Sequence, residues 1–250
     1  MLCPKCQYQR QFGDSSHPDI CPACGIVYSK YIQKHTKKVN TNKEYETISE
    51  WAEPKIHWKE KCLQAIFYVP DTIPKEAFVT RCCLLIVFSV WGLSFIIGGT
   101  TWENSGSSFM HNVNLPFHEF GHVLFIPLGE FMTILGGSLF QIMMPLICTL
   151  VFIFKQKDTF AASITFWWVG QSFIDLSPYI ADARDRALPL IGGLGEEAHD
   201  WGNLLTMMNL LNQTEFIANA SFLLGSIIII SAMLWGGWLL KTQQKNIVFI

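Results

Sequence analysis

FMTILGGSLFQIMMPLICTLVFIF, residues 131–154, contains no charged side chain. A transmembrane helix needs about 20 consecutive apolar residues, and this stretch meets that requirement. Three further segments, at about 82–102, 159–181 and 216–240, are similarly long and apolar, although Asp175 interrupts one of them near its end. The pattern predicts a mainly α-helical, polytopic membrane bundle with four crossings.

The composition agrees with a membrane protein. Half of the 250 residues are hydrophobic and 15% are charged, whereas a soluble domain carries about 25% charged residues. The charges are also segregated, because residues 1–81 hold 12 of the 18 Lys and Arg residues. Basic residues accumulate on the cytoplasmic side of a membrane, and no secretory signal peptide is expected. We therefore expect a multi-pass protein of a bacterial inner (plasma) membrane with its N-terminus in the cytoplasm.

The N-terminal part contains two Cys-x-x-Cys pairs, Cys3–Cys6 and Cys21–Cys24. Four thiolates on two tight turns form the closed tetrahedral ligand set of a structural zinc site, and Gly25 suits the turn after the second pair. Two disulfides are the alternative, but they require an oxidising compartment. The two pairs, followed by Gly25–Tyr28, resemble the short zinc ribbons found at the N-termini of many bacterial membrane proteins.

These features predict three parts. Residues 1–31 form the zinc ribbon. Residues 32–81 are a cytoplasmic linker or solvated helix followed by a segment on the membrane surface, and residues 82–250 form the transmembrane domain. Few basic residues lie within the ribbon itself, so nucleic acid is not an expected partner.

His118-Glu119-Phe120-Gly121-His122 carries the chemistry. Histidines four residues apart lie on one face of a helix, where both imidazoles can bind one Zn²⁺ and the glutamate can act as general base. Asn114 is the predicted N-cap of this helix, with Pro116 in its first turn. Ionisable residues in an apolar segment at membrane depth indicate a functional site.

The apolar part of this helix, residues 115–128, is shorter than the hydrocarbon core of a membrane is thick. It rises ~21 Å, against a hydrocarbon core of ~30 Å. If it enters and returns on the outer side, the lysines at 155, 157, 241 and 245 all lie inside, and the acidic loop 182–215 lies outside with the histidines. Five full crossings are the alternative. The positive-inside rule favours four crossings and a re-entrant helix.

The third zinc ligand is open between three residues. Asp200 and His199 lie in an acidic cluster where a helical pattern begins, and Asp175 lies within an apolar crossing. Gln171, Asp175 and Asp182 share one helical face by their spacing. If Asp175 is not a ligand, it is expected to orient one, as carboxylates behind zinc-bound imidazoles commonly do.

The motif at His118–His122, the apolar crossings and Asp-x-Gly-x-x-Leu at Asp200–Leu205 together resemble the site-2-protease class of membrane zinc metallopeptidases. The resemblance implies that His118 and His122 bind zinc with Asp200, and that Glu119 activates water. The chain departs from that class because its Asn-Pro-containing stretch before Asp-Gly is not reproduced and Trp201 follows Asp200 directly. His199 therefore stays an alternative to Asp200.

The sequence thus predicts a membrane zinc metalloprotease with one catalytic and one structural Zn²⁺. Its substrate would be a membrane or membrane-adjacent polypeptide, and the ribbon would bind a substrate tail or a regulatory protein. The alternative is a membrane zinc protein without catalysis, in which the buried site stabilises the helices and the ribbon is an interaction module.

Overall fold

The computed structural model describes residues 2–11, 13–14, 16–39, 57–188 and 198–248. It divides the chain into two compact units, Met1–Ile56 and His57–Ile250. Within the predicted linker, residues 32–39 belong to a helix, α1 (Tyr28–Val39), and residues 40–56 lie outside the described residues. The acidic pair at 196–197, part of the predicted acidic cluster, also lies outside them.

The N-terminal unit is built from two similar turns. In the first, the Gln7 amide donates to the Cys3 carbonyl at 2.9 Å, and in the second the Gly25 amide donates to the Cys21 carbonyl at 2.9 Å. Both residues that follow the cysteine pairs have positive φ, 60° for Gln7 and 69° for Gly25, a conformation that glycine adopts at no steric cost. Single antiparallel bridges, Leu2 to Gln9 and Ile20 to Val27, close the two turns.

The second unit is almost entirely helical. Short elements precede the first long helix: α2 (Trp58–Ile66) and the two-residue strand β1 (Ile73–Pro74), which pairs in parallel with β2 (Ile247–Val248) near the other end of the chain. The remaining helices are α3 (Lys75–Gly98), α4 (Trp102–Ser105), α5 (Phe109–Phe125), α6 (Glu130–Val151), α7 (Thr159–Ala181), α8 (Asp200–Met207) and α9 (Thr214–Gln243).

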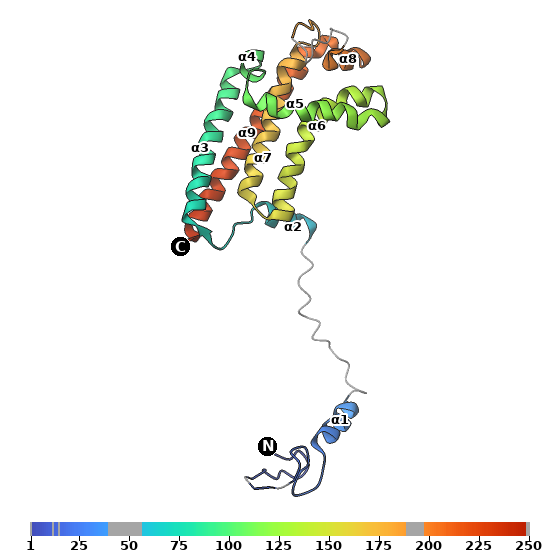
Figure 1. Cartoon of the computed structure of the whole chain (residues 1–250), viewed down its shortest axis with the longest axis vertical. Helices are drawn as coiled ribbons and strands as arrows, with labels where there is room; N and C mark the ends of the chain where they lie inside the picture. Colours follow the sequence, from blue (N-terminus) through green and yellow to red (C-terminus); the bar gives the residue numbers. More distant parts are fainter. Residues whose placement is uncertain (1, 12, 15, 40–56, 189–197, 249–250) are drawn as a thin grey trace. The chain divides into compact units, whose positions relative to one another are not determined.

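Within this unit α3, α7 and α9 run side by side, and α5 lies across them near one end (Figure 1). The first part of α6 returns along α5, and its second part turns to follow α7. Pro145 lies inside α6, where it cannot donate to the carbonyl four residues earlier and therefore bends the helix. The bend allows one helix to contact both α5 and α7.

Glycine pairs bring the helix backbones close together at two crossings. A Cβ on Gly121 of α5 would lie 2.2 Å from the carbonyl oxygen of Gly136 of α6, and a Cβ on Gly170 of α7 would lie 2.7 Å from that of Gly225 of α9. Small residues at such positions are typical of helix packing in membranes, where close van der Waals contact replaces the hydrophobic effect as the driving force.

Three helical segments among the described residues are long and apolar enough to cross a membrane, namely Lys75–Gly98, Glu130–Gln156 and Leu211–Asn246. The predicted count of four crossings is therefore not matched. The predicted segment at 159–181 is indeed a helix, α7, but it carries buried polar residues such as Ser163, Gln171 and Asp175. These side chains reduce its apolar character, and they are covered by neighbouring helices of the bundle.

Candidate metal centres

Helix α5 begins earlier than its sequence predicts. Ser108 is the N-cap, and its hydroxyl accepts a hydrogen bond from the His111 amide at 3.2 Å. Asn114 and Pro116 therefore lie inside the helix, and the predictions that Asn114 caps it and that Pro116 lies in its first turn were wrong. The serine is a good cap in its own right, and Asn114 has hydrogen-bond partners elsewhere in the bundle.

His118 and His122 lie on one face of α5, as their spacing predicts. Their ring centroids are 4.9 Å apart. Asp200, the first residue of α8, approaches both rings: its Oδ2 atom is 3.0 Å from Nε2 of His118 and 3.3 Å from Nε2 of His122. One ligand atom from each of these three residues lies within 4.8 Å of the others. We call this group the His–His–Asp cluster.

The donor set of the cluster suits zinc, which takes imidazole nitrogen and carboxylate oxygen ligands at ~2.0–2.1 Å in tetrahedral geometry. Ligand atoms placed in this way are about 3.3 Å from one another, close to the two separations from Asp200. A tetrahedral ion held by three protein atoms keeps a fourth position for water or substrate. The residues present therefore fit a zinc ion with one open coordination position.

Gly137 of α6 faces the two imidazoles. A Cβ at this position would lie 2.5 Å from Nε2 of His122 and 2.7 Å from Nε2 of His118. No side chain can be accommodated there without displacing the rings. The space in front of the ligand nitrogens is therefore kept open by the absence of a side chain on α6.

Hydrogen bonds fix the orientation of both rings. Nδ1 of His122 lies 2.8 Å from the carbonyl oxygen of Thr133, and Nδ1 of His118 lies 3.0 Å from Oε1 of Gln141. Because both oxygens accept, each Nδ1 carries the proton. Each Nε2 then has a lone pair for a metal ion, an arrangement that also raises the basicity of the ligand.

Asp175 of α7 lies at the centre of the hydrogen-bond network next to the two imidazoles, and its side chain is 3% exposed. Its Oδ2 accepts from Nε2 of Gln141 and from Nδ2 of Asn114, each at 2.9 Å, and its Oδ1 is 3.1 Å from Nδ1 of His111. A carboxylate can only accept, so it turns the Gln141 amide nitrogen toward itself and the amide oxygen toward His118. The structure thus places Asp175 behind the cluster.

The predicted trio on the face of α7 divides between two places. Gln171 joins the same buried network, since its Oε1 accepts from Nδ2 of Asn114 at 2.9 Å. Asp182 lies just beyond the end of α7 and accepts from the backbone amides of Ala187 and Leu188 at 3.0 and 2.9 Å. It therefore shapes the chain beyond α7 and is separate from the network around Asp175.

His199 lies outside the cluster. It is the N-cap of α8, and its Nδ1 accepts from the Gly202 amide at 3.0 Å, so its Nε2 carries the proton and faces Oδ2 of Asp182 at 3.2 Å. Burial lowers the pKa of His199 by more than Asp182 raises it, consistent with a neutral ring. With both nitrogens engaged, His199 holds the start of α8, where the next residue is Asp200.

The surroundings of Asp200 favour the ionised form of its carboxyl group. Burial raises the pKa of this carboxyl, but its close contacts with His118 and His122 lower it by more, so the net shift is downward. Its backbone amide donates to the Tyr179 hydroxyl at 3.0 Å. The Asp200 residue is thus held by α7 as well as by the cap of its own helix.

A cavity of about 700 Å³ opens onto the cluster between α5, α6, α7 and α8. Glu119 lines it together with the two histidines and Asp200. No hydrogen bond or ion pair to the Glu119 side chain is found in the described part of the chain. A carboxylate that faces the cavity without a protein partner can accept a proton from a molecule bound beside the cluster.

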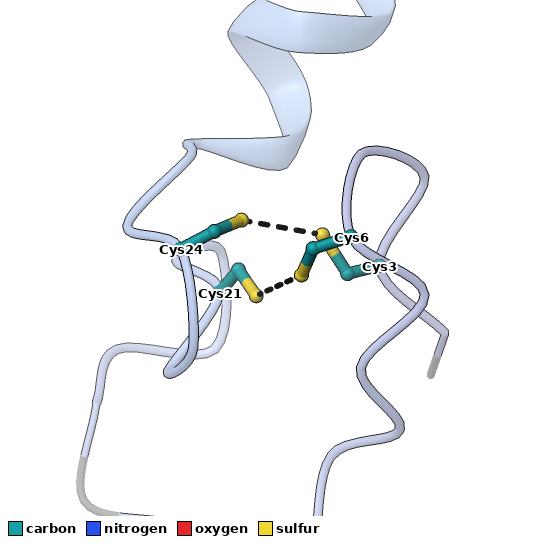
Figure 2. Close-up of side chains that lie close together, drawn as sticks. All are labelled: Cys3, Cys6, Cys21 and Cys24. Carbon is teal, nitrogen blue, oxygen red and sulfur yellow. Dashed lines mark hydrogen bonds between the residues drawn. The ribbon is translucent and has the colours of Figure 1, made fainter.

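The N-terminal unit brings its four cysteines together, and all four are free thiols. Sγ of Cys3 is 3.6 Å from Sγ of Cys24, and Sγ of Cys6 is 3.7 Å from Sγ of Cys21 (Figure 2). Sulfur atoms ~2.3 Å from a tetrahedral zinc ion are about 3.8 Å apart, so the spacing suits a metal, and no disulfide joins the four cysteines. Cys3 and Cys21 are buried, and Tyr28 packs against them.

Several residues of the site were missed by sequence reasoning. These residues are Gly137, Tyr179, His111 and Thr133. Thr133 contributes through its backbone carbonyl, which leaves no signal in the side chain. His111 had one: it lies seven residues before His118, about two turns away on the same helix face.

Comparison with family models, with curated proteins and with solved structures finds no match to this chain. The interpretation of the site therefore depends on its own geometry.

Proposed function

We propose that this chain is a zinc-dependent metalloprotease of the membrane, similar in chemistry to the site-2-protease class. The observation that supports it best is the convergence of His118, His122 and Asp200 at a cavity that Glu119 also lines. Three long apolar helices support a multi-pass membrane protein. The substrate class that fits this setting is a polypeptide within or beside the membrane.

In this proposal His118, His122 and Asp200 would hold a zinc ion, which would supply a Lewis acid for a peptide carbonyl and for the attacking water. Glu119 takes the proton of the attacking water and delivers it to the amine nitrogen as the peptide bond breaks. Asp175 and Gln141 keep His118 in the tautomer that binds metal.

The four cysteines are proposed to hold a second, structural zinc ion, which the closed set of thiolates would surround completely. We infer that the N-terminal unit is a zinc ribbon that contacts a substrate tail or a regulatory protein. The excess of basic residues in the first third of the chain supports a cytoplasmic location for it. Protease protection of the N-terminus in inside-out and right-side-out vesicles tests this location.

The test of catalysis compares the full-length protein in detergent with Glu119→Gln. Glu215, in the first turn of α9, is exposed and provides the matched control, Glu215→Gln. We expect both variants to keep the metal content of the wild type. Cleavage of a fluorogenic library of apolar peptides should be lost only in Glu119→Gln.

Two results would count against the proposal. If peptide cleavage survives in Glu119→Gln, the assigned base is wrong. If the wild type binds zinc at the His–His–Asp cluster but cleaves neither the library nor co-expressed membrane polypeptides, the chain is a non-catalytic membrane zinc protein.

A further inference from the structure

A second feature of the cavity is the pair formed by His111 and Asp175. His111 lines the cavity together with the cluster, and its side chain is 22% exposed, whereas that of Asp175 is 3% exposed. The buried carboxylate oxygen Oδ1 lies 3.1 Å from Nδ1 of His111. The imidazole therefore stands between a buried anion and the open space of the cavity.

His111 lies on nearly the same face of α5 as the histidines of the His–His–Asp cluster. His111 and His118 are seven residues apart, which is about 10 Å along a helix and returns to nearly the same face. An extended polypeptide rises about 3.3 Å per residue. A substrate lying along this face with its scissile bond at the cluster would therefore bring a group about three residues away close to His111.

The chemistry of the pair determines what this group can be. A carboxylate only accepts, so Nδ1 of His111 carries a proton, and the adjacent charge of Asp175 favours protonation of the second nitrogen as well. A protonated imidazole held by a buried carboxylate presents an N–H donor on its opposite edge. Donors of this kind form their strongest hydrogen bonds with anionic oxygen.

The surroundings hold His111 in this position. The Trp102 ring of α4 contacts it edge-on with centroids 5.2 Å apart. The second oxygen of Asp175 is already occupied by Asn114 and Gln141. Asp175 thus has two hydrogen-bond partners that do not depend on His111, and its Oδ1 atom stays directed toward the imidazole.

We propose that His111, with Asp175 behind it, is a substrate-binding subsite that receives a carboxylate of the polypeptide about three residues from the bond that is cut. The carboxylate can come from an acidic side chain or from a free C-terminus. The subsite deepens the proposed function, on which its role in cleavage rests, and it would determine which bond of an apolar segment reaches the cluster.

Binding tests the subsite without turnover. The zinc-loaded, full-length Glu119→Gln protein is titrated in detergent with fluorescein-labelled short peptides of alanine, leucine and serine. One peptide carries a single glutamate and a second carries glutamine there, each with an amidated C-terminus. A third has the glutamine and a free C-terminal carboxylate. The neutral reference is the peptide with glutamine and an amidated C-terminus. If the subsite receives an acidic side chain, we expect the glutamate peptide to bind about tenfold more tightly than this reference. If it receives a free C-terminus, we expect the same gain for the peptide with the C-terminal carboxylate.

The same titration in Glu119→Gln/His111→Gln and Glu119→Gln/His111→Phe should abolish this preference. The matched control is Glu119→Gln/His17→Gln, which replaces an exposed imidazole of the N-terminal unit and should keep it. Zinc content and thermal unfolding of each variant establish that the fold and the cluster are intact. Equal binding of charged and neutral peptides by the parent protein would overturn the subsite and leave His111 only a partner of Asp175.

Cleavage of the same peptides by the wild-type protein is the second test of the subsite. If the subsite is correct, moving the glutamate along the peptide should move the cleaved bond with it, at a constant separation of about three residues. Cleavage that ignores the glutamate would reject the subsite while leaving the metalloprotease intact. Absence of cleavage, with the tenfold binding preference retained, would reject the proposed function and leave a carboxylate-binding cavity.

Discussion

A Cβ atom on Gly137 would lie 2.5 Å from Nε2 of His122, so the candidate metal ligands of α5 are open only because α6 presents a glycine to them. This relationship joins packing and chemistry. The same segment of α6 approaches the backbone of α5 through Gly136 and Gly121. Helix packing thus brings α6 close enough to cover the imidazoles, and Gly137 preserves the space that a ligand needs.

Gly137→Ala should therefore remove the metal of the His–His–Asp cluster. The methyl group would contact both ligand nitrogens at distances that real side chains do not adopt, so the rings must turn away or the helices must separate. We expect the metal content measured by mass spectrometry to fall by one equivalent per chain, and peptide cleavage to fall with it.

Gly237→Ala on α9 is the matched control, because a Cβ there would meet only Leu85, at an ordinary contact distance of 3.9 Å. Its metal content should equal that of the wild type. If Gly137→Ala kept both metal equivalents, the ion would have to lie elsewhere than in front of the two Nε2 atoms.

Asp175→Asn tests whether the Asp175 carboxylate orients Gln141 toward His118. The substitution keeps the size of the side chain but allows it to donate as well as accept, so Gln141 is no longer forced to turn its oxygen toward His118. We expect the zinc affinity of the cluster to fall about 10–100-fold, the usual effect of losing such a partner. Competition with a fluorescent zinc chelator measures the change.

An exposed carboxylate provides the comparison for this loss. Asp185→Asn lies at an exposed position beyond α7 and should leave the zinc affinity unchanged. Unchanged affinity in Asp175→Asn would mean that the tautomer of His118 is set without Asp175.

How far the fold was predictable depends on the range of the interactions involved. The long apolar segments become helices α3, α6, α7 and α9, because membrane-length helices are encoded by local composition. The predicted count of four crossings is not matched because α7 contains buried polar residues, some of which have partners on other helices. Asp175, for example, is buried because His111, Asn114 and Gln141 surround it, and no local pattern shows this.

The candidate site was likewise predictable where local spacing determines it, and not where contacts between distant segments do. Spacing alone places His118 and His122 together, since four residues are close to one helical turn. Two of the three candidates for the third ligand, His199 and Asp200, are adjacent in the sequence, and the local pattern could not separate them. The difference arises from the start of α8, where His199 binds the Gly202 amide and Asp182 while Asp200 turns toward α5.

The capping role of His199 leads to a prediction on stability. His199→Asn should retain the cap, because asparagine is among the best N-cap residues, whereas His199→Ala should lose about 1 kcal/mol of free energy of unfolding relative to it. The alanine variant should also bind zinc more weakly, since the start of α8 positions Asp200. Denaturant titration of the purified protein and chelator competition measure the two effects.

The outcome that would contradict this role is specific. If His199→Asn and His199→Ala both lost the metal of the cluster completely while keeping wild-type stability, His199 would be a ligand. Its hydrogen bonds to Gly202 and Asp182 would then not describe the metal-bound state.

The two candidate metal sites lie in separate units, and their metals should be lost independently. Replacing Cys3 and Cys21 by serine leaves two of the four thiolates, which is too few for a closed tetrahedral site. We expect one metal equivalent to be lost, the N-terminal unit to become sensitive to protease, and the metal of the His–His–Asp cluster to remain. Cys148→Ser, on α6, is the control for loss of a thiol and should keep both equivalents.

Conversely, His118→Ala/His122→Ala should release the other equivalent and leave the N-terminal unit resistant to protease. If either pair of substitutions removed both metals, the two sites would be coupled, and the division of the chain at residue 56 would not describe how it binds metal.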